Sequence, residues 1–281
     1  MDSDKMLYLF CAMRCEALPV IEAYGLSNRF KCPGGTTVFL SDDGRTILAL
    51  TGMGKTSMSY AAGEVFALYP PDETSAAVNV GVCAGKGIGD TFLVSKVTDH
   101  DTGRDLYPDI LYETGLKTSS LVTVSRFIND GIEDDRLLYD MEGSAFAEAC
   151  ISRIGCARTC LIKIVSDMGD GANLTEDKVR DLVRGRIDII RHVTDVYSGG
   201  VSRSEMCESE PDIGEYAELF RCSETMRNEI MRLLRYSLSS RIDMPGMIEK
   251  MRKEGLLPVA SRKDGKEMLN VLRRRIIYSK L

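Results

Sequence analysis

Cys160-Leu161-Ile162-Lys163-Ile164-Val165 is a short, mostly apolar run, and it ends on the polar pair Ser166-Asp167. A run of this length and composition predicts a strand buried within a sheet. In open α/β sheets ligands bind beyond the carboxyl ends of the strands, so Asp167 is expected to face a crevice. Asp140-Met141-Glu142-Gly143 places a second acid at the start of a predicted helix, directly after a turn. The two acids together indicate a site that can hold a sugar and protonate a leaving group.

Predicted strands and helices alternate over the first 198 residues and are joined by glycine-rich turns. This alternation predicts a three-layer α/β/α fold with a central mixed sheet and helices on both faces. Asp42-Asp43-Gly44 predicts a hairpin turn. Apolar runs predict strands at 6–12, 36–40, 46–51, 76–82, 91–97, 121–124 and 160–165. Helix start signals and helical spacing predict helical stretches at 16–24, 57–69, 142–154 and 175–196.

The composition is typical of a globular protein. Of the 281 residues, 44% are hydrophobic and 28% are charged, which excludes a disordered or membrane-embedded chain. Nine cysteines without a Cys-x-x-Cys pair indicate reduced thiols, and with only His100 and His192 no zinc ligand set is expected. No apolar run approaches the ~20 residues of a membrane span. We therefore expect a soluble, cytoplasmic protein that binds no metal.

Residues 199–281 differ from the rest of the chain in charge and in pattern. The first 198 residues carry 20 Lys and Arg against 29 Asp and Glu, whereas from Lys250 onward basic residues outnumber acidic ones by 10 to 3. After a linker at 198–202, helical spacing predicts three helices, which begin near Tyr216, Pro245 and Lys266. The sequence therefore predicts an α/β domain at 1–198 and a basic, all-helical extension at 199–281.

Two interpretations of the basic extension are open. In the one we favour, the helices form an appendage packed on the body, and their basic face is solvated. In the other, Arg273-Arg274-Arg275 and neighbouring basic residues dock an acidic protein partner or nucleic acid. The extension has no helix-turn-helix signature, zinc ligands or interleaved aromatic residues, so nucleic-acid binding is not favoured.

Gly52-Met53-Gly54-Lys55-Thr56 resembles a phosphate-binding loop at first sight. The Walker pattern requires a glycine five residues before Gly54, where this chain has Ala49. We therefore predict a tight strand-to-helix turn for this motif. A second glycine cluster, at 81–89, follows a predicted strand, and glycines there allow a ligand to approach the backbone closely.

Six short motifs occur in the order in which one enzyme superfamily carries them. They are Ala12-Met13-x-x-Glu16, Thr51-Gly52-Met53-Gly54-Lys55, Asn79-Val80-Gly81, Ser125-Arg126-Phe127-Ile128-Asn129, Asp140-Met141-Glu142-Gly143 and Val165-Ser166-Asp167. On these motifs, residues 5–198 resemble the nucleoside phosphorylase superfamily, and within it most closely the methylthioadenosine/S-adenosylhomocysteine nucleosidases. The resemblance does not extend beyond residue 198.

The resemblance implies a nucleosidase mechanism that depends on two acids in different protonation states. Asp167 would protonate purine N7, which makes the base a better leaving group, and Ser166 would help with orientation. Glu16 would position or deprotonate the attacking water. The expected reaction is hydrolysis of the N-glycosidic bond of a 5′-modified adenine nucleoside: methylthioadenosine, S-adenosylhomocysteine or 5′-deoxyadenosine. No metal or organic cofactor is expected.

The resemblance also implies which residues bind the substrate. Glu142 would bind the ribose hydroxyls, and Met141 would pack against the sugar. Phe127 would stack on the base, while the backbone at Ile128 reads its edge. The remaining substrate-binding residues are Met13, Val82 and Cys83.

The chain departs from the pattern of the nucleosidases at several positions. Val82 and Cys83 stand where those enzymes usually carry Ser-Ala, so a hydroxyl near the nucleophile is missing. Lys163 replaces a usual arginine, which keeps the charge but loses the planar fork of donors. Segments 110–120 and 129–139 look shortened, and in the family these regions cover the 5′ group and build the dimer interface. The 5′ specificity and the expected homodimer therefore stay open.

Two alternatives to hydrolysis are kept. Phosphorolysis needs cations for inorganic phosphate, but Asn79 and Val80 stand where an arginine is expected, and the charge of Glu16 would oppose an anion near Arg14. Hydrolysis is therefore favoured over phosphorolysis. The alternative from another class is a catalytically degenerate nucleoside-binding module with a partner-docking helical tail, which Val82 and the shortened segments motivate.

Overall fold

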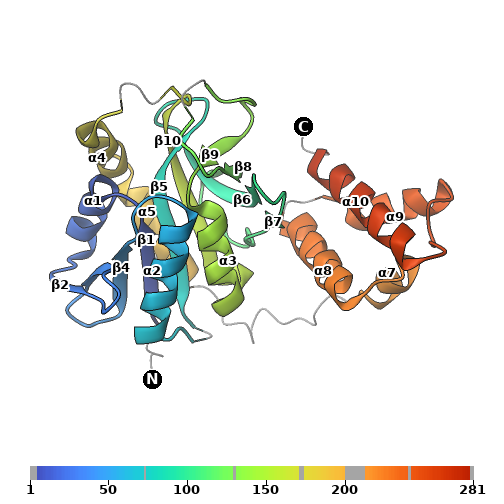
Figure 1. The fold of residues 1–281 in the computed structure, drawn as a ribbon, viewed down its shortest axis with the longest axis horizontal. Coiled ribbons are helices and arrows are strands. Elements are labelled where there is room, and N and C mark those ends of the chain that lie inside the picture. The colour runs from blue at the N-terminus through green and yellow to red at the C-terminus, as the bar shows by residue number, and fades with distance from the viewer. Residues whose placement is uncertain are drawn as a thin grey trace. The chain divides into compact units, whose positions relative to one another are not determined.

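The chain forms two compact units, Met1–Ser202 and Arg203–Leu281, and each is described by itself (Figure 1). The computed structural model describes residues 5–72, 74–128, 131–170, 174–199, 213–239 and 242–278. The linker predicted at 198–202 is wrong at its first two residues, which end the helix α5 (Ile187–Gly199), and its remainder from residue 200 on lies outside the described residues.

The first unit is built on a ten-stranded mixed sheet, with the order β10-β6-β8-β9-β5-β1-β4-β3-β2 and β7 paired to β6. An additional pairing of β10 with β5 closes five of the strands on one another. β5 lies between β1 and β10 and is parallel to both, so the carboxyl ends of these three strands meet at one edge. The strands are β1 (Leu7–Cys11), β2 (Asn28–Lys31), β3 (Thr37–Leu40), β4 (Thr46–Leu50), β5 (Ala76–Ala84), β6 (Thr91–Asp99), β7 (Asp105–Leu106), β8 (Lys117–Thr123), β9 (Leu138–Asp140) and β10 (Thr159–Asp167).

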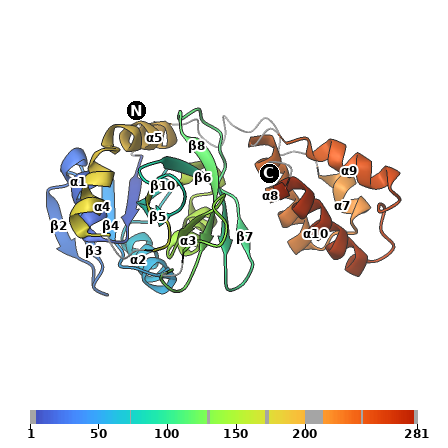
Figure 2. The ribbon, with the colours of Figure 1, turned by 90° about the horizontal axis from the view of Figure 1, so that it is seen from above.

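Helices cover both faces of this sheet, which confirms the three-layer prediction (Figure 2). Successive side chains of a strand point to opposite faces, so β1 contributes to two cores. Leu9 packs with Val193 and Tyr197 on one side. Phe10 packs edge-on against Phe66 and Phe146 on the other. The first side carries α1 (Arg14–Tyr24), α4 (Glu176–Arg184) and α5 (Ile187–Gly199), and the second carries α2 (Lys55–Leu68) and α3 (Gly143–Arg153).

The first unit differs from the sequence-based predictions in one helix and three strands, and it confirms one predicted turn. The helical stretch predicted at 175–196 divides into α4 and α5 around Gly185. The hairpin turn at 42–44 joins β3 to β4, as predicted. Strands β2, β7 and β9 were not predicted, because each is too short or too polar to give an apolar run: β2 is the four-residue sequence Asn-Arg-Phe-Lys.

The second unit contains four described helices, where the sequence predicts three. They are α7 (Gly214–Leu219), α8 (Glu224–Ser239), α9 (Met244–Lys253) and α10 (Arg262–Tyr278). The predicted helical run that begins near Tyr216 is interrupted at Arg221, whose φ of +46° no right-handed helix can contain. None of the described helices of the chain is long and apolar enough to cross a membrane.

The second unit has an apolar interior and its ion pairs at the surface. Gly265 of α10 lies against the turn between α7 and α8, where an added Cβ would stand 1.9 Å from the Phe220 carbonyl oxygen. A side chain at this position would therefore separate α10 from that turn. The most deeply buried apolar residues, each at most 2% exposed, are Phe220, Ile230, Leu233, Met244, Ile248, Met251, Leu269, Leu272 and Ile276.

Candidate active site

A pocket opens at the carboxyl ends of β1, β5 and β10, and it brings together all ten residues that the sequence analysis assigned to the site. Those residues are Met13, Glu16, Val82, Cys83, Phe127, Ile128, Met141, Glu142, Ser166 and Asp167. The pocket is also lined by eight residues that were not predicted: Ala12, Met53, Ala84, Val124, Arg126, Tyr139, Asp140 and Leu174.

Glu16 lies in the first turn of α1 and is held by three backbone amides. Its Oε2 accepts hydrogen bonds from the amides of Ala12 at 3.1 Å and Met13 at 2.8 Å. Its Oε1 accepts one from the amide of Val82 at 2.8 Å. A carboxylate offers about four acceptor positions, so one position on Oε1 stays available to a water molecule.

The side chain of Glu16 is 2% exposed, and its oxygens approach the backbone of β5. A Cβ at Gly81 would lie 3.0 Å from Glu16 Oε1, so glycine at position 81 leaves room for this close approach. Burial raises the pKa of Glu16, while the three amides and the charge of Lys163 act in the opposite direction. A buried carboxylate with a raised pKa is a stronger base than an exposed one.

Asp167 is the last residue of β10, and two donors fix its orientation. The Ser166 hydroxyl donates to Asp167 Oδ2 at 2.6 Å, and the amide of Gly169 donates to Oδ1 at 2.8 Å. The Ser166 hydroxyl also lies 3.2 Å from the carbonyl oxygen of Cys83 on the neighbouring strand. Ser166 therefore contacts the carboxylate of Asp167, the group that the resemblance implies Ser166 helps to orient.

Glu142 precedes α3 and reaches the turn that opens α2. Its Oε1 accepts a hydrogen bond from the amide of Gly54 at 2.5 Å. Gly52 and Gly54 have φ values of +79° and +95°, so the motif at 52–56 forms a strand-to-helix turn that only glycine adopts without strain. Burial and the charge of Asp140 raise the pKa of Glu142 to about 7, while Lys163 and the Gly54 amide act against this rise.

A buried ion pair lies between these acids. Lys163 Nζ stands 2.8 Å from Asp140 Oδ2, and both side chains are at most 2% exposed. Asp140 also accepts hydrogen bonds from the Gly143 amide and the Thr123 hydroxyl, both at 2.8 Å. The acids Glu16 and Glu142 raise the pKa of Lys163 together with Asp140, against the effect of burial. The buried cation of Lys163 thus interacts electrostatically with the three buried carboxylates of Asp140, Glu16 and Glu142.

Asp140 belongs to the motif at 140–143 but was not predicted as a site residue. The signal was present, because Asp140 and Lys163 each fall at the polar end or middle of an otherwise apolar strand. Two opposite charges on buried strands are most economically explained as a pair, and β9 and β10 both pair with β5. Among the described residues, no group of three or more His, Cys, Asp or Glu side chains is arranged to hold a metal ion.

Some of the apolar residues that line the pocket are open to solvent. Phe127 is 53% exposed and Met53 is 62% exposed. Met141 is partly exposed and lies next to Glu142. An exposed aromatic ring above buried acids suits a planar base bound by stacking.

The first unit has the fold of solved 5′-methylthioadenosine/S-adenosylhomocysteine nucleosidases and of futalosine hydrolase. 5′-Methylthioadenosine/S-adenosylhomocysteine nucleosidase of Helicobacter pylori is similar with a TM-score of 0.58 at 15% identity, over 69% of this chain and 99% of that one. 5′-Methylthioadenosine nucleosidase of Arabidopsis thaliana has a TM-score of 0.59 at 23% identity, over 70% of this chain and 97% of that one. Futalosine hydrolase of Helicobacter pylori has a TM-score of 0.57 at 15% identity, over 68% and 97%. No protein-family model and no curated protein sequence matches the chain.

Proposed function

We propose that this protein is a purine nucleosidase, which hydrolyses the N-glycosidic bond of a 5′-modified adenine nucleoside to adenine and the free sugar. The observation that carries the proposal is the convergence of Glu16, Glu142 and Asp167 on one pocket at the carboxyl ends of parallel strands. Each acid comes from a different segment, and each has a different set of hydrogen-bond donors.

The base leaves with the help of Asp167. In its protonated form Asp167 donates a proton to purine N7 as the bond between C1′ and N9 breaks, so the electron pair of that bond stays on a neutral base. Ser166 and the Gly169 amide hold the carboxyl group in one orientation, which suits proton transfer along a fixed direction. Phe127 stacks on the base, and the backbone at Ile128 reads its edge.

Water completes the reaction at C1′. The acceptor position left on Glu16 Oε1 binds the water and takes its proton, and the water oxygen bonds to the oxocarbenium-like C1′. Glu142 has only one of its oxygens engaged by Gly54, so it retains acceptor positions for the ribose hydroxyls. Every proton in this sequence is supplied by water or a side chain.

The proposal includes a cytoplasmic homodimer and gives the basic extension no part in the chemistry. The exposed apolar side chains of Met53 and Phe127 at the pocket rim support a covering second copy. Light scattering at several concentrations tests the dimer independently of activity.

The decisive experiment follows release of free base from methylthioadenosine, S-adenosylhomocysteine, 5′-deoxyadenosine and inosine, each with and without phosphate. Base release that does not need phosphate supports the nucleosidase. Strict dependence on phosphate overturns it in favour of a phosphorylase. If no base is released but a nucleoside raises the melting temperature, the protein is a nucleoside-binding module.

A further inference from the structure

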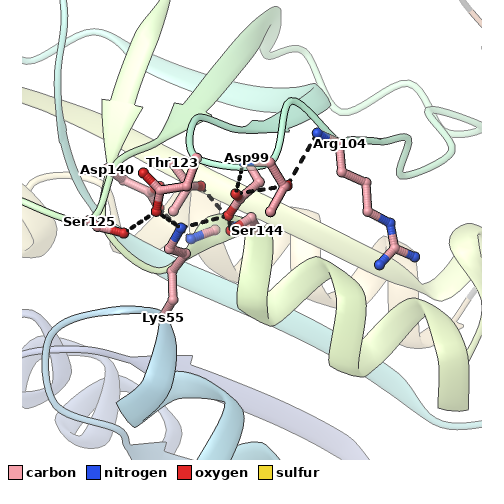
Figure 3. A network of polar contacts seen from close by, with 10 residues as sticks. Lys55, Asp99, Arg104, Thr123, Ser125, Asp140 and Ser144 are labelled. Carbon is pink, nitrogen blue, oxygen red and sulfur yellow. Dashed lines mark hydrogen bonds and ion pairs between the residues drawn. The ribbon is translucent and has the colours of Figure 1, made fainter.

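Lys55 is the basic residue of the glycine motif at 52–56, and the pocket does not use it. Its Nζ lies 2.8 Å from Asp99 Oδ2 and 2.6 Å from Asp101 Oδ2 (Figure 3). The Lys55 side chain is 23% exposed and that of Asp99 is 13% exposed, so the pair is partly shielded from water. With two carboxylates on its amine, Lys55 has the surroundings of a structural cation and not of a phosphate ligand.

Asp99 carries this contact onward to the start of α3. The Ser144 hydroxyl donates to Asp99 Oδ2 at 2.9 Å. The Ser144 amide in turn donates to the Thr123 hydroxyl at 2.8 Å, and that hydroxyl donates to Asp140 at 2.8 Å. A continuous polar chain therefore runs from the first residue of α2 to the first turn of α3, as Figure 3 shows.

The same two helix starts meet a second time inside the pocket. The Gly54 amide, one residue before Lys55, donates to Glu142, two residues before Ser144. The turn at 52–54 is thus attached to the start of α3 at two neighbouring points. One point is the Glu142 carboxylate itself, and the other is the contact of Lys55 with Asp99 and Ser144.

We propose that Lys55 is a positioning residue for Glu142: it fixes the turn whose Gly54 amide orients the sugar-binding carboxylate. The role of Glu142 toward the sugar rests on the proposed function, whereas the attachment itself does not. Lys55 touches neither the pocket nor a substrate, and it acts through Gly54.

The charges around Lys55 explain why this attachment depends on it. Burial acts to raise the pKa of Asp99, but hydrogen bonds from Lys55, Ser144 and Thr102 hold that pKa well below its usual range. Without the lysine, the carboxylates of Asp99 and Asp101 would face each other with no cation between them. Both carboxylates contact the same Nζ, so they lie close enough to repel each other once the lysine is removed. Asp99 would then turn away from Ser144, and the second attachment would be lost.

The test replaces Lys55 and follows two readouts. Lys55→Met is compared with Lys55→Arg, which keeps the charge. The matched control is Lys86→Met, which removes a lysine whose ion pair with Asp135 is more than half exposed. The first readout is hydrogen exchange at the Gly54 amide. The second is KM and kcat for a ribonucleoside and for its 2′,3′-dideoxy analogue.

In Lys55→Met we expect Gly54 exchange to quicken, and KM for the ribonucleoside to rise about tenfold with kcat changed less than about threefold. The dideoxy analogue lacks the hydroxyls that Glu142 binds, so its KM should hardly change. Lys55→Arg keeps the charge, so its Gly54 exchange and its KM should stay close to those of the wild type. Lys86→Met should match the wild type.

The outcomes separate the two proposals. If Gly54 exchange in Lys55→Met equals that of the control, the positioning role is wrong, whatever the kinetics. It is also wrong if KM rises equally for both substrates, because a general loosening of the fold would do that. If the wild type releases no base from any nucleoside, the proposed function fails, and Gly54 exchange alone then tests the attachment.

Discussion

The two units of this protein differ in whether charged side chains are buried in their interiors. In the first, Lys163 and Asp140 are fully buried, and Glu16 and Glu142 are at most 8% exposed. In the second, the ion pairs Arg252–Glu215 and Arg275–Glu254 join side chains that are 31–69% exposed, around an apolar interior.

Burying charge costs several kcal/mol per ion unless partners compensate, so a fold does not need such a cluster for stability. The second unit demonstrates this, because none of its described charged side chains is buried, and Ser237 is the one buried polar side chain among those residues. Under the proposed function, the buried charges of the first unit are the part of the molecule that the chemistry would use.

The largest effect is expected from Asp167→Asn. The amide cannot protonate N7, so base release should fall by a factor of about 10² to 10⁴, the usual contribution of a general acid. Circular dichroism should show an unchanged fold, since the amide oxygen still accepts from Gly169. Asp177→Asn is the control, because Asp177 is an exposed acid of α4 with a side chain 77% exposed. Unchanged activity in Asp167→Asn would remove Asp167 from the mechanism.

The next effect concerns the buried pair. Lys163→Met leaves Asp140 buried without its cation, and breaking such a pair costs about 3–5 kcal/mol. Urea denaturation of the first unit, followed by circular dichroism, should show this loss. Lys163→Arg keeps the charge and should retain more of the stability. A Lys163→Met variant as stable as the wild type would mean that the cluster is not a constraint on the fold.

The sequence predicted the centre of the first unit because its inner strands must be apolar. β1, β5 and β10 are covered on both faces, so each appears as a continuous apolar run. β2 is an edge strand with three of four residues exposed, and polar composition there carries no strand signal. The break at Arg221 was missed for a similar reason, since the apolar spacing continues through it and only the backbone angle reveals it.

The location of the site was predicted because Glu142 and Asp167 open a helix or follow a strand, and such positions share one edge of a sheet. The full set of ten residues came from the resemblance to the nucleosidases. The connections between them could not be predicted. The bond from Gly54 to Glu142 joins residues 88 positions apart, and it depends on how α2 and α3 pack. The pairing of Lys163 with Asp140 likewise depends on β9 and β10 both lying beside β5, an arrangement that apolar patterns do not specify. The roles assigned to the ten residues stay predictions.

A smaller effect, on pH dependence, should come from Glu142. Its pKa of about 7 in the folded protein lies above its ordinary value of 4.5. Ionised Glu142 accepts hydrogen bonds from the ribose hydroxyls, so KM should fall several-fold as pH rises through about 7. The free energy of unfolding responds in the opposite direction. The folded state binds the Glu142 proton more tightly than the unfolded chain, so this proton stabilises the fold fully below about pH 4.5. The stabilisation is lost as pH rises through about 7.

Glu142→Gln should raise KM and remove its dependence on pH near 7. Glu148→Gln, in the exposed part of α3, is the control and should keep the wild-type profile. A KM that does not change between pH 6 and pH 8 in the wild type would contradict the assignment of Glu142 as an ionised sugar ligand.

The smallest effect is expected in the second unit. Arg275→Met removes the ion pair with Glu254, whose 2.6 Å contact is solvated on both sides. Exposed pairs contribute little because water and salt already screen them, so the urea midpoint should not move measurably. Leu272→Ala, one helical turn away and fully buried, should instead cost about 2–5 kcal/mol through the cavity it leaves. If Arg275→Met lowered the free energy of unfolding as much as Lys163→Met, exposed and buried ion pairs would contribute equally to stability here. The burial of the Lys163 cluster would then no longer support a functional role for it.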